Sequence, residues 1–362
     1  MMNLVLLAGL GGTLASLEAT GQAARVLRTD LRAYCQAFEG VTYLGYGPDD
    51  RMVARRWLHD LTGFQRFRVP SVPRYLHPWA WSLVMAPMRA NVFRDASVVR
   101  VMSASGALPA YLARRWWGVP YVVHVGYDAA VVAEVLGHPV RARAQRWLRH
   151  LTLSKAAAVT ASRLGLWSNA ILLENGVDVE RFTPQRRTPG PAAVLYVGRL
   201  AREKNLDVLV RACRLASVRL ILAGDGPERP ALEALALAED ADVVFLGVQP
   251  HELLPTICST ADIFALPSLT EGSPKALLEA MACAMPCVVS PAAAVIEHRK
   301  TGVVVPENDP EAWAAAFRQL ARKRDLAHVF GDAARAYVVE HHDATRLLQA
   351  EVALVASRAR RD

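Results

Sequence analysis

The stretch that most constrains the fold is residues 261–290, ADIFALPSLTEGSPKALLEAMACAMPCVVS. The apolar residues 263–266 predict a buried strand, and the pattern from residue 274 onward predicts a helix. A second apolar run, residues 287–290, predicts another strand. Because a strand, a turn, a helix and a second strand in this order are typical of a βαβ unit, the segment predicts an α/β fold.

The polar turn at residues 270–274 contains the residues of this unit that could bind a ligand. Gly272 permits backbone torsions that other residues resist, Ser273 can cap a helix, and Pro274 suits a first helical position. A helix that begins here presents free N–H groups and a positive dipole end. The turn therefore predicts a site for an anion such as phosphate.

Two carboxylates frame this helix start. Glu271 lies in the turn, and Glu279 lies about one helical turn further along the chain. If the residues from 274 onward are helical, the apolar positions face the sheet and Glu279 lies on a flank, directed toward an anchored ligand. A carboxylate in that place suits a vicinal diol, because it can accept hydrogen bonds from both hydroxyls of a nucleotide ribose.

Glu271 and Glu279 have seven residues between them and stand in the pattern L-P-S-x-x-E-G-x-P-x-x-L-L-E-A-M-A. This stretch resembles the E-x7-E motif of the retaining, nucleotide-sugar-dependent glycosyltransferases of family four, which have the GT-B fold. An ordinary βαβ unit with a solvated glutamate on its helix is the alternative. The resemblance implies two Rossmann-like domains that face each other across a cleft, with a C-terminal helix that crosses back to the N-terminal domain.

Residues 194–205 carry the same resemblance, to the family's V-G-R-L-x-x-x-K-N/G element. Arg199 and Lys204 place two cations beside a predicted strand end and helix start. Because arginine offers a fork of donors and lysine a compact charge, the two side chains suit a pyrophosphate. A basic pair on the surface is the alternative for these residues. Residues 224–227 resemble the family's G-x-G-P loop.

The N-terminal half begins with an apolar strand at residues 4–8 and a loop that contains Gly11 and Gly12. A dinucleotide fingerprint needs a glycine at position 14, where this chain has Leu14, so the fingerprint is incomplete. The loop resembles the first glycine loop of the glycosyltransferase family, which lines the cleft near the donor.

Residues 98–125 predict a strand, a helix and a second strand that contains His124. This run resembles the family's N-terminal domain, where the last strand often ends in His-Gly at the reaction centre. In this chain His124 stands one residue early, and a one-residue offset turns a side chain to the opposite face of a strand. A core position is therefore an alternative for it. Tyr127 and Asp128 follow at the strand tip, where acceptor contacts are expected.

The resemblance implies a role for each of these residues. Glu271 and His124 are the expected catalytic residues. The expected donor-binding residues are Gly11, Gly12, Arg199, Lys204, Gly272, Ser273, Pro274, Lys275 and Glu279, and the expected acceptor-binding residues are Tyr127 and Asp128. We expect no metal ligand and no cofactor, because cations and amide groups can neutralise a departing diphosphate in place of a divalent metal.

The length and composition predict two domains. The 362 residues, 52% of them hydrophobic, can bury more than one core. Residues 184–191 (PQRRTPGP) have the clearest linker composition. We expect an N-terminal Rossmann-like acceptor-binding domain at 1–183, a linker at 184–191, a C-terminal Rossmann-like nucleotide-sugar-binding domain at 192–335, and a C-terminal helix at 336–362 that packs toward the N-terminal domain.

The net charge of +8 lies entirely in the N-terminal half. Residues 1–180 hold 20 Arg and Lys against 12 Asp and Glu, whereas residues 181–362 hold 22 of each kind. No nucleic-acid-binding motif accompanies this charge, so nucleic acid is not an expected partner. The arginines of residues 51–94 are mixed with aromatic residues, which suits an anionic membrane surface or a phosphate-bearing acceptor. An arginine-rich solvated face is the alternative.

The location is predicted from cysteine use and apolar runs. Five cysteines without a C-x-x-C pair predict free thiols in a reducing compartment, not a disulfide framework or a zinc site. No apolar run reaches the length of a membrane span, and the apolar start of the chain lacks the basic residues of a signal peptide. We expect a cytoplasmic protein, with peripheral contact at the inner face of the membrane as a further expectation.

The resemblance also implies a reaction. A sugar moves, with retention, from a nucleotide-sugar (a UDP-sugar is favoured) to a hydroxyl of a glycan, lipid-linked or small-molecule acceptor, in bacterial cell-surface polysaccharide or glycoconjugate synthesis. A GT-B-fold epimerase or phosphorylase is one alternative. A non-catalytic partner subunit is another, suggested by the offset of His124 and by Ala294, which stands where the family usually has a glutamate.

Overall fold

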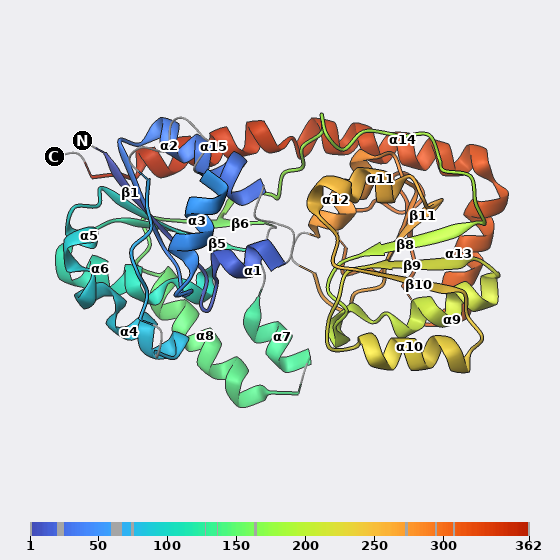
Figure 1. The fold of residues 1–362 in the computed structure, drawn as a ribbon, viewed down its shortest axis with the longest axis horizontal. Helices are drawn as coiled ribbons and strands as arrows, with labels where there is room; N and C mark the ends of the chain where they lie inside the picture. Colours follow the sequence, from blue (N-terminus) through green and yellow to red (C-terminus); the bar gives the residue numbers. More distant parts are fainter. Residues whose placement is uncertain are drawn as a thin grey trace. The chain divides into compact units, whose positions relative to one another are not determined.

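The computed structural model describes residues 2–19, 25–58, 67–73, 76–126, 128–135, 137–162, 165–271, 274–293, 295–306 and 308–360. The chain forms two compact units, Met1–Glu174 with Arg346–Asp362, and Asn175–Thr345. Figure 1 shows that each unit is built from a sheet with helices packed around it. The predicted α/β class with two Rossmann-like domains is confirmed.

Unit 1 contains a parallel sheet in the order β3-β2-β1-β4-β5-β6-β7. Its strands are β1 (Asn3–Leu7), β2 (Gly40–Leu44), β3 (Phe67–Arg68), β4 (Val98–Val101), β5 (Tyr121–Val125), β6 (Ala158–Ala161) and β7 (Ile171–Leu172). Its α-helices are α1 (Leu14–Ala19), α2 (Leu31–Ala37), α3 (Asp50–Leu58), α4 (Pro78–Met88), α5 (Ala90–Arg94), α6 (Leu108–Trp117), α7 (Ala129–Val135), α8 (Pro139–Leu153) and most of α15 (Ala344–Ser357).

Unit 2 contains a parallel sheet in the order β10-β9-β8-β11-β12-β13. Its strands are β8 (Ala193–Val197), β9 (Arg219–Ala223), β10 (Val243–Gly247), β11 (Ile263–Leu266), β12 (Cys287–Val289) and β13 (Val303–Val304). Its α-helices are α9 (Asp207–Ala216), α10 (Arg229–Ala238), α11 (Leu254–Cys258), α12 (Lys275–Ala282), α13 (Pro310–Arg322) and α14 (Arg324–His341), and two 3-10 turns, η3 (Arg202–Lys204) and η4 (His251–Leu253), precede α9 and α11.

Both sheets have the strand order of a doubly wound fold. In each sheet the first strand in the chain lies between the second and the fourth. The strand order therefore reverses beside the first strand. The central strands are apolar because helices cover both faces of a parallel sheet: every residue of β4 and of β11 is buried. The ends of β1 and β4, and of β8 and β11, are therefore the places where ligand-binding loops gather.

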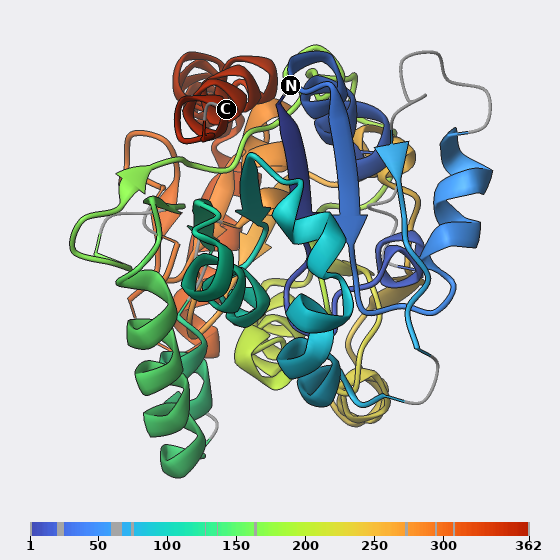
Figure 2. The same ribbon diagram turned by 90° about the vertical axis from the view of Figure 1, so that its left-hand side faces the viewer.

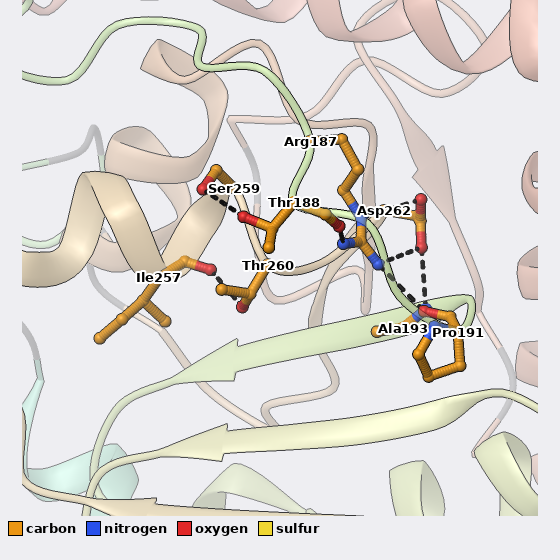
Figure 3. A network of polar contacts seen from close by, with 8 residues as sticks. All are labelled: Arg187, Thr188, Pro191, Ala193, Ile257, Ser259, Thr260 and Asp262. Atoms are coloured by element: carbon orange, nitrogen blue, oxygen red, sulfur yellow. Dashed lines mark hydrogen bonds and ion pairs between the residues drawn. The ribbon is translucent and has the colours of Figure 1, made fainter.

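The chain passes from unit 1 to unit 2 after Glu174, ahead of the predicted linker at residues 184–191. Val177 and Phe182 lie in the core of unit 2, so they belong to it and not to the first domain. Residues 184–191 are also attached to unit 2 by the contacts that Figure 3 shows. Arg187 donates to Asp262 from Nε and Nη2, at 3.1 Å each, and the Thr188 N–H donates to the Ser259 carbonyl at 2.8 Å. Composition does not reveal these long-range partners.

The C-terminal helix α15 packs into the core of unit 1, beside α2 (Figure 1). Residues from Arg346 onward belong to unit 1, whereas α14 belongs to unit 2, so the predicted boundary at 335/336 falls inside α14. Glu351 of α15 accepts hydrogen bonds from Arg100 Nε at 2.5 Å and from the Tyr34 hydroxyl at 2.8 Å. These contacts fix the helix against β4 and α2.

The carboxyl of Glu351 has a lowered pKa in the folded protein. Burial alone raises the pKa, but the charge of Arg100 and the hydrogen bonds from Arg100 and Tyr34 outweigh burial. A carboxyl with a lower pKa in the folded state stabilises the fold at pH values above its unfolded pKa, which is about 4.3. It loses that contribution as the pH falls through the folded pKa.

We therefore expect Glu351→Gln to lower the free energy of unfolding by about 3 kcal/mol at pH 7, because it leaves Arg100 buried without its counter-charge. The difference from the wild type should shrink below about pH 4. Thermal unfolding between pH 7 and pH 3 measures both effects. Glu297→Gln, which breaks an exposed pair with Lys300, is the matched control with little expected effect. A pH-independent difference would contradict the lowered pKa.

Candidate functional site

The loops that follow β8 and β11 meet at the carboxyl edge of the unit 2 sheet. The backbone N–H of Leu269, just after β11, donates to the carbonyl of Glu203, in the turn after β8, at 2.9 Å. This bond joins the two loops at the point where the strand order reverses. The segments that the sequence singles out, residues 198–205 and 267–271, are therefore neighbours in space.

Glycines allow a third loop, residues 224–226 after β9, to approach the first. A Cβ atom on Gly224 would lie 1.9 Å from the carbonyl oxygen of Gly198, and one on Gly226 would lie 2.2 Å from that of Leu200. Gly224 also has a φ of 144°, which side chains disfavour. Only glycine fits at these two positions, so the resemblance of residues 224–227 to a G-x-G-P loop has a packing reason.

Lys204 and Glu271 form an ion pair across these loops. Lys204 Nζ lies 2.6 Å from Glu271 Oε1, and the Glu271 side chain is only 9% exposed. Two residues that are 67 positions apart in the chain are thus in direct contact. The pair combines a hydrogen-bond donor for an anion with an acceptor for hydroxyl groups at one place, which is the chemistry that a sugar phosphate requires.

Arg199 lies apart from this contact. Its side chain is 66% exposed and pairs with Glu203, four residues further along. Burial raises the pKa of Glu203, but its own backbone N–H and the Arg199 guanidinium outweigh burial and lower it. Glu203 is not among the residues predicted from the sequence, although its four-residue spacing from Arg199 is the usual spacing of such a pair. The role of Arg199 toward a diphosphate stays a prediction.

Glu279, which is predicted to lie on a flank of the helix, is buried on α12. Its residue is 7% exposed, and Oε1 lies 2.8 Å from Nε2 of His251, which is 4% exposed. The His251 ring packs against Phe182, with 5.3 Å between ring centroids. The predicted contact of Glu279 with a ribose stays a prediction. No pattern in the sequence indicates this role for His251, because it lies 28 positions away from Glu279 on another element.

The proton of His251 can be placed from its surroundings. Nδ1 is buried and has no hydrogen-bond partner in the part of the chain that the structure describes. An N–H there would be left unsatisfied, so a proton on Nε2 and none on Nδ1 fits the hydrogen bonds best. Nε2 then donates to Glu279, and one carboxylate oxygen of Glu279 is held by the protein.

The start of α12 differs slightly from the prediction. Pro274 is the N-cap residue, with an extended ψ of 102°, and Lys275 is the first helical residue. Leu277, Ala280 and Met281 are buried toward the core as the pattern predicted. Gly272 and Ser273, and with them the predicted amide contacts of the turn, lie outside the described residues.

In unit 1 the glycine loop after β1 is a tight turn. Gly11 has a φ of 73°, and the Gly12 N–H donates to the Gly9 carbonyl at 2.8 Å. Asp50, which is not among the residues predicted from the sequence, is buried and accepts from the Leu14 N–H at 2.6 Å, so it orders the helix start that follows the loop. The approach of a donor to Gly11 and Gly12 stays a prediction.

His124 lies on β5, half-buried, with Nδ1 3.1 Å from the hydroxyl of Thr160 on β6. Asp128 accepts from the Ala130 N–H at 2.9 Å and pairs with Arg149 at 2.6 Å. These contacts give Asp128 a part in the start of α7, and its predicted contact with an acceptor stays a prediction. Tyr127 lies outside the described residues.

Within the described ranges no group of three or more His, Cys, Asp or Glu side chains could hold a metal ion. All five cysteines are free thiols. No helix in the described part of the chain is sufficiently long and apolar to cross a bilayer.

Residues 179–337 match the family described as "Glycosyl transferases group 1". The chain is 30% identical over 279 residues to the GDP-mannose-dependent alpha-mannosyltransferase of Mycobacterium tuberculosis, an alignment that covers 67% of this chain and 70% of that protein. The chain belongs to the group 1 glycosyltransferases. It is also 28% identical over 266 residues to the sulfoquinovosyl transferase SQD2 of Arabidopsis thaliana, which covers 66% of this chain but only 48% of that longer protein.

The solved structure of HepE from Anabaena, a complex with UDP, resembles this group 1 glycosyltransferase with a TM-score of 0.76 and 17% identity, over 99% of this chain and 100% of HepE. At that identity the likeness concerns the fold. Together with the two doubly wound sheets it confirms the GT-B fold that the E-x7-E resemblance implied.

The His251 contact leads to a test in this glycosyltransferase. We expect His251→Leu to weaken UDP binding about tenfold, because Glu279 loses a hydrogen bond to a charged acceptor. His251→Gln, which keeps an N–H donor, should retain most of the affinity. Isothermal titration with UDP measures both, and His328→Leu on the exposed surface of α14 is the control. Unchanged affinity in His251→Leu would show that the contact does not orient Glu279 for the nucleotide.

Proposed function

We propose that the protein transfers a sugar, with retention at the anomeric carbon, from a nucleotide-sugar to a hydroxyl of a glycan, lipid-linked or small-molecule acceptor. The observation that supports this most directly is the Lys204–Glu271 pair at 2.6 Å, at the carboxyl ends of β8 and β11. A cation for the departing phosphate and a carboxylate for the sugar hydroxyls lie side by side at the edge where α/β sheets bind ligands.

The donor nucleotide is proposed to be UDP. The support is the likeness to HepE, whose structure contains UDP. The relative from Mycobacterium tuberculosis is named as GDP-mannose-dependent, so GDP is the specific competitor. UDP and GDP differ in their bases. A preference between them therefore depends on contacts with the base, which neither the Lys204–Glu271 pair nor Glu279 provides.

The proposed step breaks the bond between the anomeric carbon and the diphosphate oxygen and forms a bond from that carbon to the acceptor oxygen. The acceptor proton passes to the departing phosphate oxygen on the same face, so no separate protein base is needed. Lys204, Arg199 and the amides at the start of α12 neutralise the diphosphate. Glu271 orients the donor sugar, Glu279 accepts from the ribose, and His124 is the second proposed catalytic residue. A metal is not part of this proposal.

The proposed setting is cell-surface polysaccharide or glycoconjugate synthesis in the cytoplasm, with peripheral contact at an anionic membrane. Membership of the group 1 family supports the reaction class, and the setting rests on the family resemblance alone. An epimerase or a phosphorylase of the same fold would act on the donor or on a glycoside without a second hydroxyl acceptor. A non-catalytic partner subunit would bind no nucleotide-sugar productively.

Substitutions of Glu271 and Glu279 should affect different quantities, kcat in the first case and UDP affinity in the second. Glu271→Gln should lower kcat by about a hundredfold or more with little loss of UDP affinity, because the carboxylate acts on the sugar in the transition state. Glu279→Ala should weaken UDP binding about tenfold with a smaller effect on kcat. Steady-state kinetics and UDP titration measure the two quantities. Equal losses in both variants would contradict the assigned roles.

Nucleotide binding gives the first test of the whole proposal. UDP at about a hundred times its Kd should add roughly 2.7 kcal/mol to the stability, an easily measured thermal shift. The shift should persist in EDTA, because cations and amides replace a metal. A series with UDP, GDP, ADP and their sugars identifies the base. No response to any of them would favour the partner-subunit alternative, and a shift that EDTA abolishes would contradict the metal-free site.

A further inference from the structure

One side of helix α14 packs tightly against the end of α12. Helix α14 runs horizontally in Figure 1, beside α12, and is therefore viewed nearly end-on in Figure 2. Gly331 faces the turn that follows α12, because a Cβ atom on it would lie 2.1 Å from the Ala284 carbonyl oxygen. Ala334 and Val338 are fully buried. Residues three and four apart share one side of a helix, so Arg335 lies on this same side.

The Arg335 side chain donates to three backbone carbonyls. Nη1 lies 2.8 Å from the Phe182 carbonyl oxygen and also donates to the carbonyl of Ala282. Nη2 lies 3.5 Å from the Val179 carbonyl oxygen, at the limit of a hydrogen bond. One guanidinium group thus joins α14 to two other segments of unit 2, the end of α12 and residues 179–182.

The contact with Ala282 completes the end of α12. A helix leaves its last four carbonyls without helical partners. In α12 the carbonyls of residues 279–281 accept from the N–H groups of residues 283–285. The residue that would serve Ala282 in a continued helix is Pro286, which has no N–H. Arg335 supplies the missing donor, and a cation at this place also suits the negative end of the helix dipole.

The contact with Phe182 leads to Glu279 by a second route. Phe182 is fully buried, and its ring packs against the His251 ring with 5.3 Å between the centroids. His251 Nε2 in turn lies 2.8 Å from Glu279 Oε1. Arg335 therefore holds both the helix that carries Glu279 and the aromatic ring that supports the histidine partner of Glu279.

We propose that Arg335 is a positioning residue for the nucleotide site. It sets the direction of the Glu279 carboxylate through α12 and through Phe182, and not through a contact with the nucleotide. The inference rests on the proposed role of Glu279 toward the ribose and adds the residue that fixes it. A lysine would keep the charge but not the fork of donors that joins two segments.

Isothermal titration of the full chain with UDP is the first test. Arg335→Met should weaken UDP binding about fivefold, because the hydrogen bond from the ribose to Glu279 is no longer well aligned. The effect on kcat should be smaller. Arg335→Lys should recover only part of the affinity. The matched control is Arg318→Met, since Arg318 of α13 donates to another backbone carbonyl of unit 2, that of Leu215 at 3.1 Å. It should bind UDP as the wild type does.

A double-variant cycle separates positioning from a general loss of stability. Both routes end at Glu279, so Arg335→Met should weaken UDP binding by less than about twofold in a Glu279→Ala background. Its effect on thermal unfolding should be the same in both backgrounds. Equal losses of UDP affinity in the two backgrounds would overturn the proposal. Unchanged affinity in Arg335→Met, or an equal loss in Arg318→Met, would do so too. If Arg335→Met does not fold, Arg335→Lys takes its place in the cycle.

The ring nitrogens of His251 give a readout that needs no nucleotide. Their NMR signals, assigned by their loss in His251→Gln, should shift in Arg335→Met and stay unchanged in Arg318→Met. A wild type that binds no nucleotide would reject the proposed function. Shifted His251 signals would then still show that Arg335 holds the contact between His251 and Glu279. Unshifted signals would reject the positioning role whatever the nucleotide result.

Discussion

The strand order at the centre of each sheet is the constraint on which the remaining structure depends. In unit 2, β8 lies between β9 and β11, and the helices that follow β8 and β11 cover different faces of the sheet. The loops after these two strands thus begin side by side and diverge. The hydrogen bond from the Leu269 N–H to the Glu203 carbonyl holds the two loops together. The Lys204–Glu271 ion pair joins residues of the same two loops.

The partner of each shielded carboxylate decides how it is fixed. The side chains of Glu271 and Glu279 are each 9% exposed, but Glu271 faces the ammonium group of Lys204 whereas Glu279 contacts the His251 ring. A buried carboxylate that keeps its charge needs a donor of fixed geometry. His251 supplies that donor from η4, the 3-10 turn that follows β10. The ring of Phe182 packs against the His251 ring. The orientation of α12 and the position of η4 are therefore coupled through one hydrogen bond.

The two units differ in the partners of their arginine side chains. Unit 2 neutralises its arginines in pairs such as Arg187–Asp262 and Arg219–Asp242, which hold loops and strand ends in place. In unit 1, Arg89 and Arg94 lie over the rings of Trp81 and Trp117, and Arg114 donates to the carbonyl of Gly118. Arg100 is different, because it is buried and paired with Glu351 of the last helix. The positive surface of unit 1 is thus a property of its outer helices, separate from its core.

The sequence by itself determined the fold class, the strand and helix at residues 263–282 and the family resemblance, because these depend on local periodicity and on short motifs. It also identified Lys204 and Glu271, although not that they touch. Only the tertiary structure placed His251 on Glu279, Asp50 on the glycine loop, Arg187 on Asp262 and the last helix on Arg100. Each of those contacts joins residues that are at least 28 positions apart. Such pairs form when separate elements pack, and no local pattern in a single sequence records which partner a buried charge will meet.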